Sequence, residues 1–495
     1  INLFPYIMKS NLKGGIYMCD RSIDCPFCVE YTSASPEVTG SCIQCIVHYP
    51  NHTSTLFAVD CGTFQEREYD NLNYCFSFEP KELEFLLVTH AHIDHIGRIP
   101  FLVKKGFSGP IYCTNDTKQI MDFSLRNSVH IVKSNAGKKG YEPLFVSEDV
   151  ANAMLQVRGI PINSFVKIDD HIRAYFFTNG HLIGAATILV QIFYENLQPI
   201  NIIFGGDYND RNMFFDVSKL PEEIRKLPVT IFTEATYGYM NSDEVDYCFE
   251  DNLVQFYKEH PDGIVVIPTF ALRTHEIVKT VSSMQQCGLI NPFTVYVDGK
   301  MSSTFNQMVA SGAFESIPKD NIGFLPRKFK YLRKEIRANR YTSTSPQIII
   351  ASSGTGSYGP IVNYLQNMFN REDVLFHFTG YPVPGTVARK LYDAEDEAYV
   401  NIAGLCVKKK ATVKFTSQFS AHAKQDQIMN FLTSFENPVF VIVTHGNQNP
   451  KAIIAEQALN KLNIPNVGIL SNEVRFLVGS DGLIEASSTE YDSTF

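Results

Sequence analysis

Three histidines and one aspartate lie within six residues of chain, directly after the apolar run 85–89. A continuous apolar run of this length is typical of a strand that is buried on both faces. In an extended backbone His90 and His92 project to the same side, where they can bind one metal ion. The chain must then turn for Asp94 and His95 to face a second ion. The motif therefore predicts a strand that ends at a site for two adjacent metal ions.

The alternative is that these histidines are ordinary core residues satisfied by hydrogen bonds. That explanation serves for one isolated histidine, but a crowded set without metal would carry a considerable desolvation cost. Three more candidate ligands occur further along the chain, namely His181, Asp207 and His445. Imidazole and carboxylate ligands without thiolate suit Zn²⁺, with Mn²⁺ or iron as substitutes. We therefore expect two Zn²⁺ ions.

Short apolar runs alternate with amphipathic stretches along the whole chain. Besides 85–89, the apolar runs lie at 56–60, 201–205, 229–233, 264–267, 347–351 and 439–443. Apolar residues recur at helical spacing in 146–158, 250–259, 273–286 and 451–462. This alternation predicts an α/β protein whose sheets are covered by helices. Polar residues that end or follow the runs can converge on one cleft, and they are Asp60, His90, Asp207, Glu234 and His445.

The composition restricts the location and the partners. A chain of 495 residues predicts two to four folding units. The net charge of −9 means that any nucleic acid must be bound by a local surface rather than by the charge of the whole molecule. No apolar run approaches the eighteen or so residues of a membrane span, and no signal peptide is visible. We expect a cytoplasmic protein that does not contact a membrane.

Four cysteines form two Cys-x-x-Cys pairs, Cys25 with Cys28 and Cys42 with Cys45, which loosely match a zinc ribbon. The second pair falls in the predicted strand 40–48, where residues three apart face opposite sides. The odd total of eleven cysteines also indicates reduced thiols rather than a disulfide framework. Ordinary thiols are the favoured interpretation.

The ordered motifs resemble those of the β-CASP nucleases in the metallo-β-lactamase superfamily. The wording of Gly180-His-Leu-Ile-Gly-Ala-Ala186 and Phe419-Ser-Ala-His422 is similar to that of the pre-mRNA 3′-end cleavage endonuclease subunit and its prokaryotic RNase relatives. The similarity covers most of the chain, from about Glu37 to beyond His445. It implies a metallo-β-lactamase αβ/βα sandwich built from residues 1–209 and 386–495, with a β-CASP domain inserted at 210–385.

The resemblance also implies a role for each candidate residue. Asp207 would bridge the two metal ions, and Asp60 would orient the cluster without binding metal. The first ion would be held by His90, His92 and His181, and the second by Asp94, His95 and His445. Glu234 and His422 match two further β-CASP motifs. A histidine at the position of His445, which DNA-repair members typically lack, favours RNA as the substrate.

The chemistry of such a centre follows from general principles. Two cations about 3.5–4 Å apart can bind a phosphate oxygen and lower the pKa of the water between them for in-line attack on phosphorus. The leaving ribose oxygen then needs a proton, which His422 beside Glu234 could supply, since a neighbouring carboxylate favours the imidazolium form. The alternative role of His422 is a hydrogen bond to the substrate phosphate.

Two segments are candidates for gripping the substrate backbone. Ser352 and Ser353 follow the apolar run 347–351, where hydroxyls and amides can cradle a phosphate, and ordinary turn chemistry is the alternative. They match a family motif, as do Thr386 and Arg389. The segment 327–340 carries seven basic residues and one acidic residue. As a helix it would align Arg333, Arg337 and Arg340 to follow phosphates, and a merely solvated face is the alternative.

We therefore predict a zinc-dependent ribonuclease, a metal-dependent phosphodiesterase for which endonucleolytic cleavage is favoured. A related metallohydrolase acting on DNA or on a small phosphodiester is the alternative. A noncatalytic scaffold is disfavoured because no candidate ligand is missing. RNA is the expected partner, and a homodimer or partners in a processing complex are compatible with the sequence.

Overall fold

The computed structural model describes residues 7–9, 26–217, 219–462 and 466–488. The chain divides into two compact units. The first takes in the described residues of 1–212, 216–242 and 421–495, and the second comprises 213–215 and 243–420. The predicted inserted domain, 210–385, begins earlier than the second unit, since residues 216–242 belong to the first unit. It also ends earlier, since residues 386–420 belong to the second unit. The reason is that β20 (Thr412–Phe415) pairs in parallel with β17 (Val374–Phe378) of the second unit.

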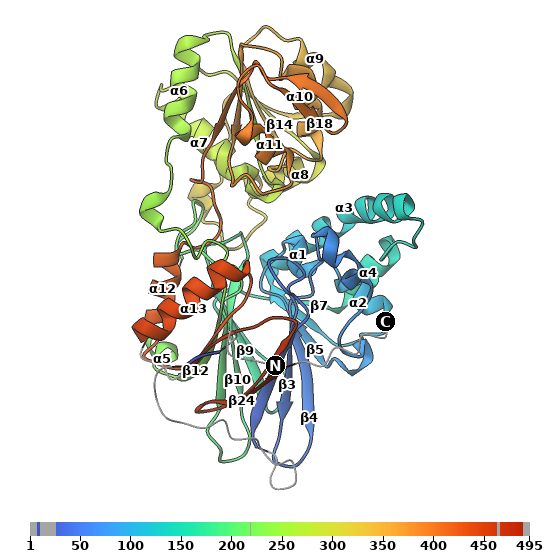
Figure 1. Ribbon diagram of the computed structural model, residues 1–495, viewed down its shortest axis with the longest axis vertical. Coiled ribbons are helices and arrows are strands. Elements are labelled where there is room, and N and C mark those ends of the chain that lie inside the picture. The colour runs from blue at the N-terminus through green and yellow to red at the C-terminus, as the bar shows by residue number, and fades with distance from the viewer. Residues whose placement is uncertain (1–6, 10–25, 218, 463–465, 489–495) are drawn as a thin grey trace. The chain divides into compact units, whose positions relative to one another are not determined.

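Two eight-stranded sheets form the first unit (Figure 1). One sheet has the order β1 (Ile7–Lys9), β22 (Asn466–Ile469), β21 (Asn437–Val443), β12 (Pro228–Thr233), β11 (Ile200–Phe204), β10 (Ala186–Ile192), β9 (Ile172–Thr178) and β8 (Ser164–Lys167). The other has the order β24 (Gly482–Ser488), β23 (Val474–Gly479), β2 (Cys28–Ser33), β3 (Ile43–His48), β4 (Ser54–Val59), β5 (Phe85–Leu87), β6 (Ile111–Thr114) and β7 (Val157–Ile160).

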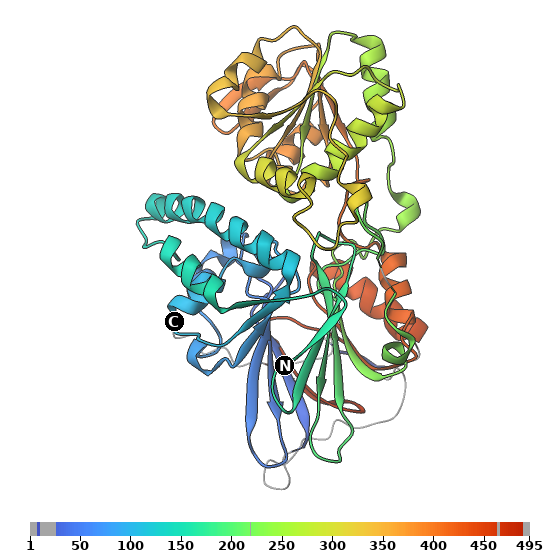
Figure 2. The same ribbon diagram turned by 180° about the vertical axis from the view of Figure 1, so that it is seen from behind.

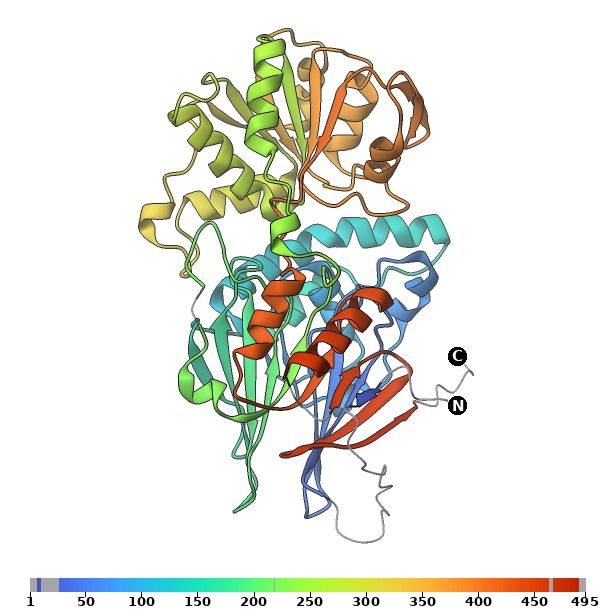
Figure 3. The ribbon, with the colours of Figure 1, turned by 60° about the vertical axis from the view of Figure 1, so that its left-hand side comes forward.

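The two sheets pack face to face and are covered by helices on their outer faces. Side chains of both sheets, such as Phe57 of β4 and Phe176 of β9, share one buried core. The first sheet is covered by α5 (Glu222–Arg225), α12 (Gln425–Thr433) and α13 (Gln448–Leu462) (Figure 3). The second sheet is covered by α1 (Ile93–Ile96), α2 (Ile99–Lys104), α3 (Asn115–Lys139) and α4 (Ser147–Gln156) (Figure 2). This four-layer order confirms the predicted αβ/βα sandwich.

Strand direction in the first unit places the candidate site. The neighbours β11, β12 and β21 run parallel, so their carboxyl ends meet at one edge of the sheet. Asp207, Glu234 and His445 all follow these ends. In the other sheet β4 and β5 also run parallel, and Asp60 and His90 follow their ends. The apolar runs thus form the predicted strands. The polar residues that follow these runs lie at the carboxyl ends of the strands.

The second unit contains a six-stranded sheet whose paired strands are all parallel. Its order is β15 (Phe329–Leu332), β14 (Thr294–Asp298), β16 (Gln347–Ala351), β13 (Ile264–Pro268), β17 and β20. Its α-helices are α6 (Phe249–Glu259), α7 (Thr274–Gln286), α8 (Lys300–Ala310), α9 (Ala338–Tyr341), α10 (Pro360–Met368) and α11 (Val387–Asp393), and a hairpin is formed by β18 (Tyr399–Ile402) and β19 (Leu405–Lys408). The predicted α/β alternation is confirmed here as well.

The basic segment 327–340 does not form the single helix that its spacing suggested. It forms β15, a short 3₁₀ turn and α9. Arg337 donates hydrogen bonds of 2.5 and 2.8 Å to the buried carboxylate of Asp298. Arg340 lies over the ring of Tyr296 and donates to its hydroxyl at 3.0 Å. Both arginines thus have partners within the second unit, and the segment does not form the helix that would align them with Arg333.

Cys25 of the proposed cysteine pairs lies outside the described residues. Cys28 and Cys45 are buried on β2 and β3, and Cys42 is buried just before β3. No described cysteine joins a group of side chains that could hold a metal ion. Among the described helices none is long and apolar enough to cross a membrane.

Candidate metal centre

The His-x-His-x-Asp-His motif changes backbone conformation where the two-ion arrangement requires it. β5 ends at Leu87, and His92 is still extended, with φ −72° and ψ 150°. α1 begins at the next residue and carries Asp94 and His95 in its single turn. The four side chains therefore divide into two pairs that can face different ions, as the motif predicted.

The first group consists of His90, His92, His181 and Asp207. Nδ1 of His92 lies 3.1 Å from Nε2 of His90 and 3.0 Å from Nε2 of His181. Thr89 donates its hydroxyl proton to Asp60, so it accepts from Nδ1 of His90 at 3.1 Å. Nδ1 of His181 likewise donates to a carbonyl oxygen, that of Ala421, at 3.2 Å.

These second bonds decide the tautomers of His90 and His181. A neutral imidazole has one N–H, so each ring presents a lone pair on Nε2. Both lone pairs point toward Nδ1 of His92, which can donate to only one of them. Burial lowers the pKa of His90 well below its usual value and that of His92 to about 4, so both rings are neutral, as metal ligands must be. The group fits a metal ion better than it fits a hydrogen-bonded cluster.

The second group consists of Asp94, His95 and His445. Nδ1 of His95 donates to Asp60 at 2.8 Å, which leaves Nε2 of His95 without a hydrogen bond although it is buried. Nε2 of His445 is also buried without a hydrogen bond, and it lies 3.8 Å from the carboxylate of Asp94. A buried polar atom without a partner is costly, and a cation between these atoms removes that cost.

Asp207 contacts members of both groups. Its Oδ2 lies 3.7 Å from Nε2 of His90 and 3.3 Å from Nε2 of His95, and its Oδ1 lies 3.3 Å from Nδ1 of His445. Burial raises the pKa of Asp207, but the neighbouring His445 and His95 outweigh burial and hold it well below the usual value. A permanently ionised carboxylate between the groups is suited to bridging two cations, the role that the resemblance assigned to it.

The candidate metal ligands are held by side chains outside the two candidate groups. Asp60 accepts the backbone N–H and the hydroxyl of Thr89 at 2.8 and 2.7 Å, as well as the N–H of His95. Thr236 contacts Nδ1 of His445 at 3.0 Å. Sequence reasoning gave Asp60 its orienting role but overlooked Thr89 and Thr236. Thr89 stood inside the recognised motif, whereas nothing near Thr236 in the sequence pointed to His445.

Replacing Asp60 by asparagine should lower metal affinity and phosphodiester hydrolysis by about 10–100-fold, because partners that orient metal-binding histidines have effects of this size. Asparagine keeps the shape but cannot accept from both Thr89 and His95 as a charged group. Metal titration by calorimetry and steady-state kinetics would measure the two effects. Unchanged affinity and rate in a folded variant would contradict the orienting role.

Beside the metal centre, Glu234 and His422 form a pair. Oε2 of Glu234 lies 2.7 Å from Nδ1 of His422, and Oε1 accepts the backbone N–H of Tyr208 at 2.9 Å. Burial lowers the pKa of His422, but Glu234 and Asp207 outweigh burial and raise it above the usual value. Nδ1 of His422 lies 3.9 Å from Asp207. The pair can therefore present a protonated Nε2 next to the candidate ligands.

All four predicted phosphate-binding residues belong to the second unit. The hydroxyl of Ser353 contacts Thr355 and a carbonyl oxygen of its own loop, both at 3.1 Å. Thr386 caps α11 by accepting the N–H of Arg389, and Arg389 pairs with Asp393 at 2.8 Å. Ser352 directly follows β16. The structure joins this loop to the start of α11, since Ser357 accepts the N–H of Val387 at 3.0 Å. Phosphate binding here stays a prediction.

Three segments of the chain match known protein families. Residues 52–174 match the metallo-beta-lactamase superfamily, 274–391 match the Beta-Casp domain, and 407–466 match the Zn-dependent metallo-hydrolase RNA specificity domain. The chain belongs to the β-CASP nucleases of the metallo-β-lactamase superfamily. Membership identifies this β-CASP protein as a metal-dependent phosphodiesterase, and its fold implies that it binds divalent metal.

Curated relatives of this β-CASP protein match over most of its length. Transcription termination factor FttA of Methanosarcina mazei is 26% identical, over 85% of this chain and 68% of the relative. Ribonuclease TTHA0252 of Thermus thermophilus is 27% identical, over 84% of this chain and 92% of the relative. The Integrator complex subunit 11 homolog of Dictyostelium discoideum is 24% identical, over 82% of this chain and 54% of the relative.

Proposed function

We propose that the chain is a zinc-dependent ribonuclease that cleaves RNA endonucleolytically with two metal ions. The observation that carries the proposal is the pair of donor groups that share contact with Asp207, beside a histidine that is ready to donate a proton. The match to an RNA specificity domain and the name of the Thermus relative, a ribonuclease, support RNA as the substrate. The imidazole and carboxylate donors support zinc.

One ion would be held by His90, His92 and His181, and the other by Asp94, His95 and His445. Asp207 would contact both ions. Bound divalent ions supply Lewis acidity, which neutralises phosphate charge and lowers the pKa of water. The remaining steps belong to the chain's own groups.

His422 is the group that we assign to proton transfer. Its Nδ1 is held by Glu234, so the ring cannot turn away and Nε2 carries the transferable proton. When the P–O bond breaks, that proton passes from Nε2 to the leaving ribose oxygen, and the ring is left neutral. Water then restores the proton for the next turnover. A positioned acid of this kind contributes about 10²–10⁴-fold to the rate.

The test measures metal content and cleavage on the same protein. Mass spectrometry of purified protein should find about two zinc equivalents per chain. An internally labelled RNA oligonucleotide should be cut within its length, whereas the matched DNA should be cut much more slowly. The variant Asp94→Ala/His95→Ala should lose metal and cleavage together. Equal cleavage of DNA, or full activity in this variant, would contradict the proposal.

The fate of an RNA with both ends blocked separates the two cleavage modes. Cleavage of that RNA supports endonucleolytic action, and products released one nucleotide at a time from a 5′ end would contradict it. One relative is named as the homolog of a complex subunit. We therefore propose that the chain can also act with partner proteins. The other possible assembly is a homodimer, which light scattering of the isolated chain would detect.

A further inference from the structure

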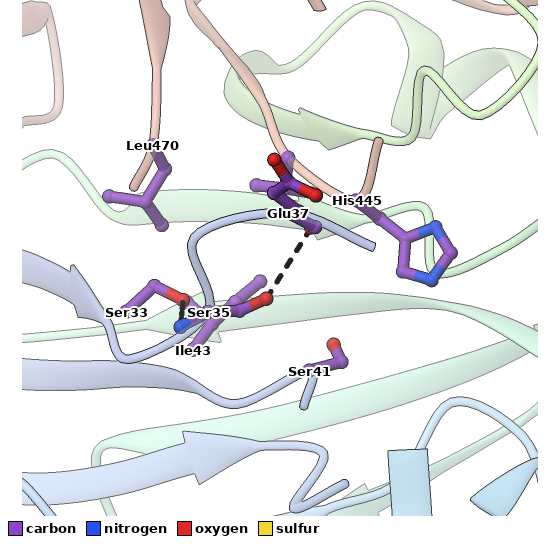
Figure 4. A pocket seen from close by; sticks show the side chains of 8 residues that line it. Ser33, Ser35, Glu37, Ser41, Ile43, His445 and Leu470 are labelled. Carbon is purple, nitrogen blue, oxygen red and sulfur yellow. Dashed lines mark hydrogen bonds between the residues drawn. The ribbon is translucent and has the colours of Figure 1, made fainter. Parts of the chain in front are cut away.

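A polar recess adjoins the metal centre on the side of His445 (Figure 4). It has a volume of about 20 Å³, which is room for one water-sized group. Its polar lining consists of Ser33, Ser35, Glu37, Ser41, Thr444 and His445, and all of these residues belong to the first unit. None of the four hydroxyl residues has a part in the metal centre or in proton transfer as described above.

The loop 33–41, which forms most of the polar lining, is fixed from several sides. The hydroxyl of Ser35 donates to the carbonyl oxygen of Thr39 at 2.8 Å, and the N–H of Ser35 donates to the hydroxyl of Ser33 at 3.1 Å. Behind the loop, the buried ammonium of Lys451 donates to the carbonyl oxygen of Pro36 at 3.1 Å. The recess is thus preorganised, and it does not need to be assembled by a ligand.

The loop is also tied directly to the candidate ligands. The N–H of Ser41 donates to the carbonyl oxygen of Asp94 at 2.9 Å, and the carbonyl oxygen of Ser41 accepts the N–H of Gly62 at 2.8 Å. Thr444, which also lines the recess, immediately precedes His445. A group that occupies the recess would therefore lie next to His445, a candidate ligand of the second group.

The chemistry of the lining selects the kind of group that can occupy it. Glu37 contributes a carboxylate, the serines and Thr444 contribute hydroxyls, and no lysine or arginine of the described residues lines the recess. A phosphate is larger than this space and would meet the carboxylate of Glu37 there. A neutral group that donates a hydrogen bond would find an acceptor in the carboxylate and further partners in the hydroxyls. The small volume restricts that group to a single hydroxyl or an equivalent.

We propose that this recess binds the 2′-hydroxyl of the ribose next to the cleaved phosphate, so that it makes cleavage selective for RNA over DNA. The inference rests on the proposed function, because it requires a nucleic acid at the metal centre. The 2′-hydroxyl is the group that distinguishes the two nucleic acids at a given site, and it both donates and accepts. Glu37 is the acceptor that we assign to it, and Ser41 is the neighbouring hydroxyl partner.

The experiment is a double-mutant cycle in which one enzyme side chain and one 2′-hydroxyl of the substrate are removed separately and together. Wild type, Glu37→Gln and Ser41→Ala are each assayed on an RNA with one cleavage site and on the same RNA with a single 2′-deoxy nucleotide on either side of the cleaved phosphate. Glu148→Gln, an exposed glutamate on α4, serves as the matched control. Metal content and thermal unfolding are measured for every variant, which identifies a variant that has lost the centre or the fold.

At one deoxy position kcat/KM of the wild type should fall by about tenfold, the effect expected for a hydrogen bond to a charged acceptor. Glu37→Gln should lose about tenfold on the all-RNA substrate and less than about twofold on that deoxy substrate, and the control should resemble wild type. Equal losses of Glu37→Gln on both substrates would overturn the inference, as would a wild type that tolerates deoxy at both positions. A wild type that cleaves no RNA would instead contradict the proposed function, so the two failures are distinct.

Discussion

Replacing Asp207 by asparagine should lower kcat/KM for RNA by about 10³-fold or more, because transition-state stabilisation by bound cations amounts to several kcal/mol. Asp207 lies within 3.7 Å of imidazole nitrogens from both donor groups, so one substitution weakens both metal positions. Asparagine preserves the volume of the side chain but removes the negative charge that would offset the two proposed cations. Metal content by mass spectrometry should fall together with the rate.

The matched control for this prediction is Asp262→Asn, an exposed aspartate in the second unit, which should keep both metal and activity. Circular dichroism would verify that Asp207→Asn is folded. A folded Asp207→Asn variant that retains about two metal equivalents and the wild-type rate would contradict a shared position between the ions.

Replacing His422 by alanine should lower RNA cleavage by about 10²–10⁴-fold while metal content stays that of the wild type. The reason is that in the proposed mechanism His422 supplies a proton to the leaving group and belongs to neither of the two proposed ligand sets. Its ring is held at 2.7 Å by Glu234, and burial is outweighed by Glu234 and Asp207, so its pKa is raised and the proton is retained until it is transferred.

A substrate with a better leaving group separates proton donation from simple phosphate binding. Nitrophenolate leaves without a proton, so His422→Ala should hydrolyse a nitrophenyl phosphodiester within about tenfold of the wild-type rate. A loss as large as that on RNA would instead favour the alternative, in which His422 only hydrogen-bonds the phosphate. A parallel loss of metal would show that His422 is a ligand, since Asp207, Glu234, His422 and His445 also lie close enough together to hold an ion.

The local part of the site could be predicted because it depends on backbone geometry alone. An apolar run followed by His-x-His-x-Asp-His has to leave a strand and then turn, and the structure places His92 in extended backbone and Asp94 in α1. Asp207 and His445 were predicted as candidate ligands because they follow strands, whereas His181 was assigned through the family resemblance. Parallel neighbours such as β11, β12 and β21 bring their carboxyl ends to one edge of the sheet.

Predictions failed where a side chain had a partner far away in the chain. Seven basic residues in 327–340 predicted a phosphate-following helix, yet Arg337 is bound to Asp298 on a neighbouring strand. The density of charge in a sequence does not show that a buried carboxylate, here that of Asp298, lies close enough to pair with one of the basic residues. The compact units also differ from the predicted domains, since the pairing of β20 with β17 joins segments that the motifs had separated.

The amino-acid sequence alone was sufficient to predict the fold class and the family and to nominate candidate metal ligands, because strand periodicity and short motif spacing are local properties of the chain. The three-dimensional structure was needed to assign the protonated nitrogens of His90, His181 and His95, whose Nδ1 atoms face Thr89, Ala421 and Asp60, respectively. It alone also placed loop 33–41 against His445 and so created the hydroxyl-lined recess. Both depend on contacts between segments far apart in the chain, which composition and spacing do not encode.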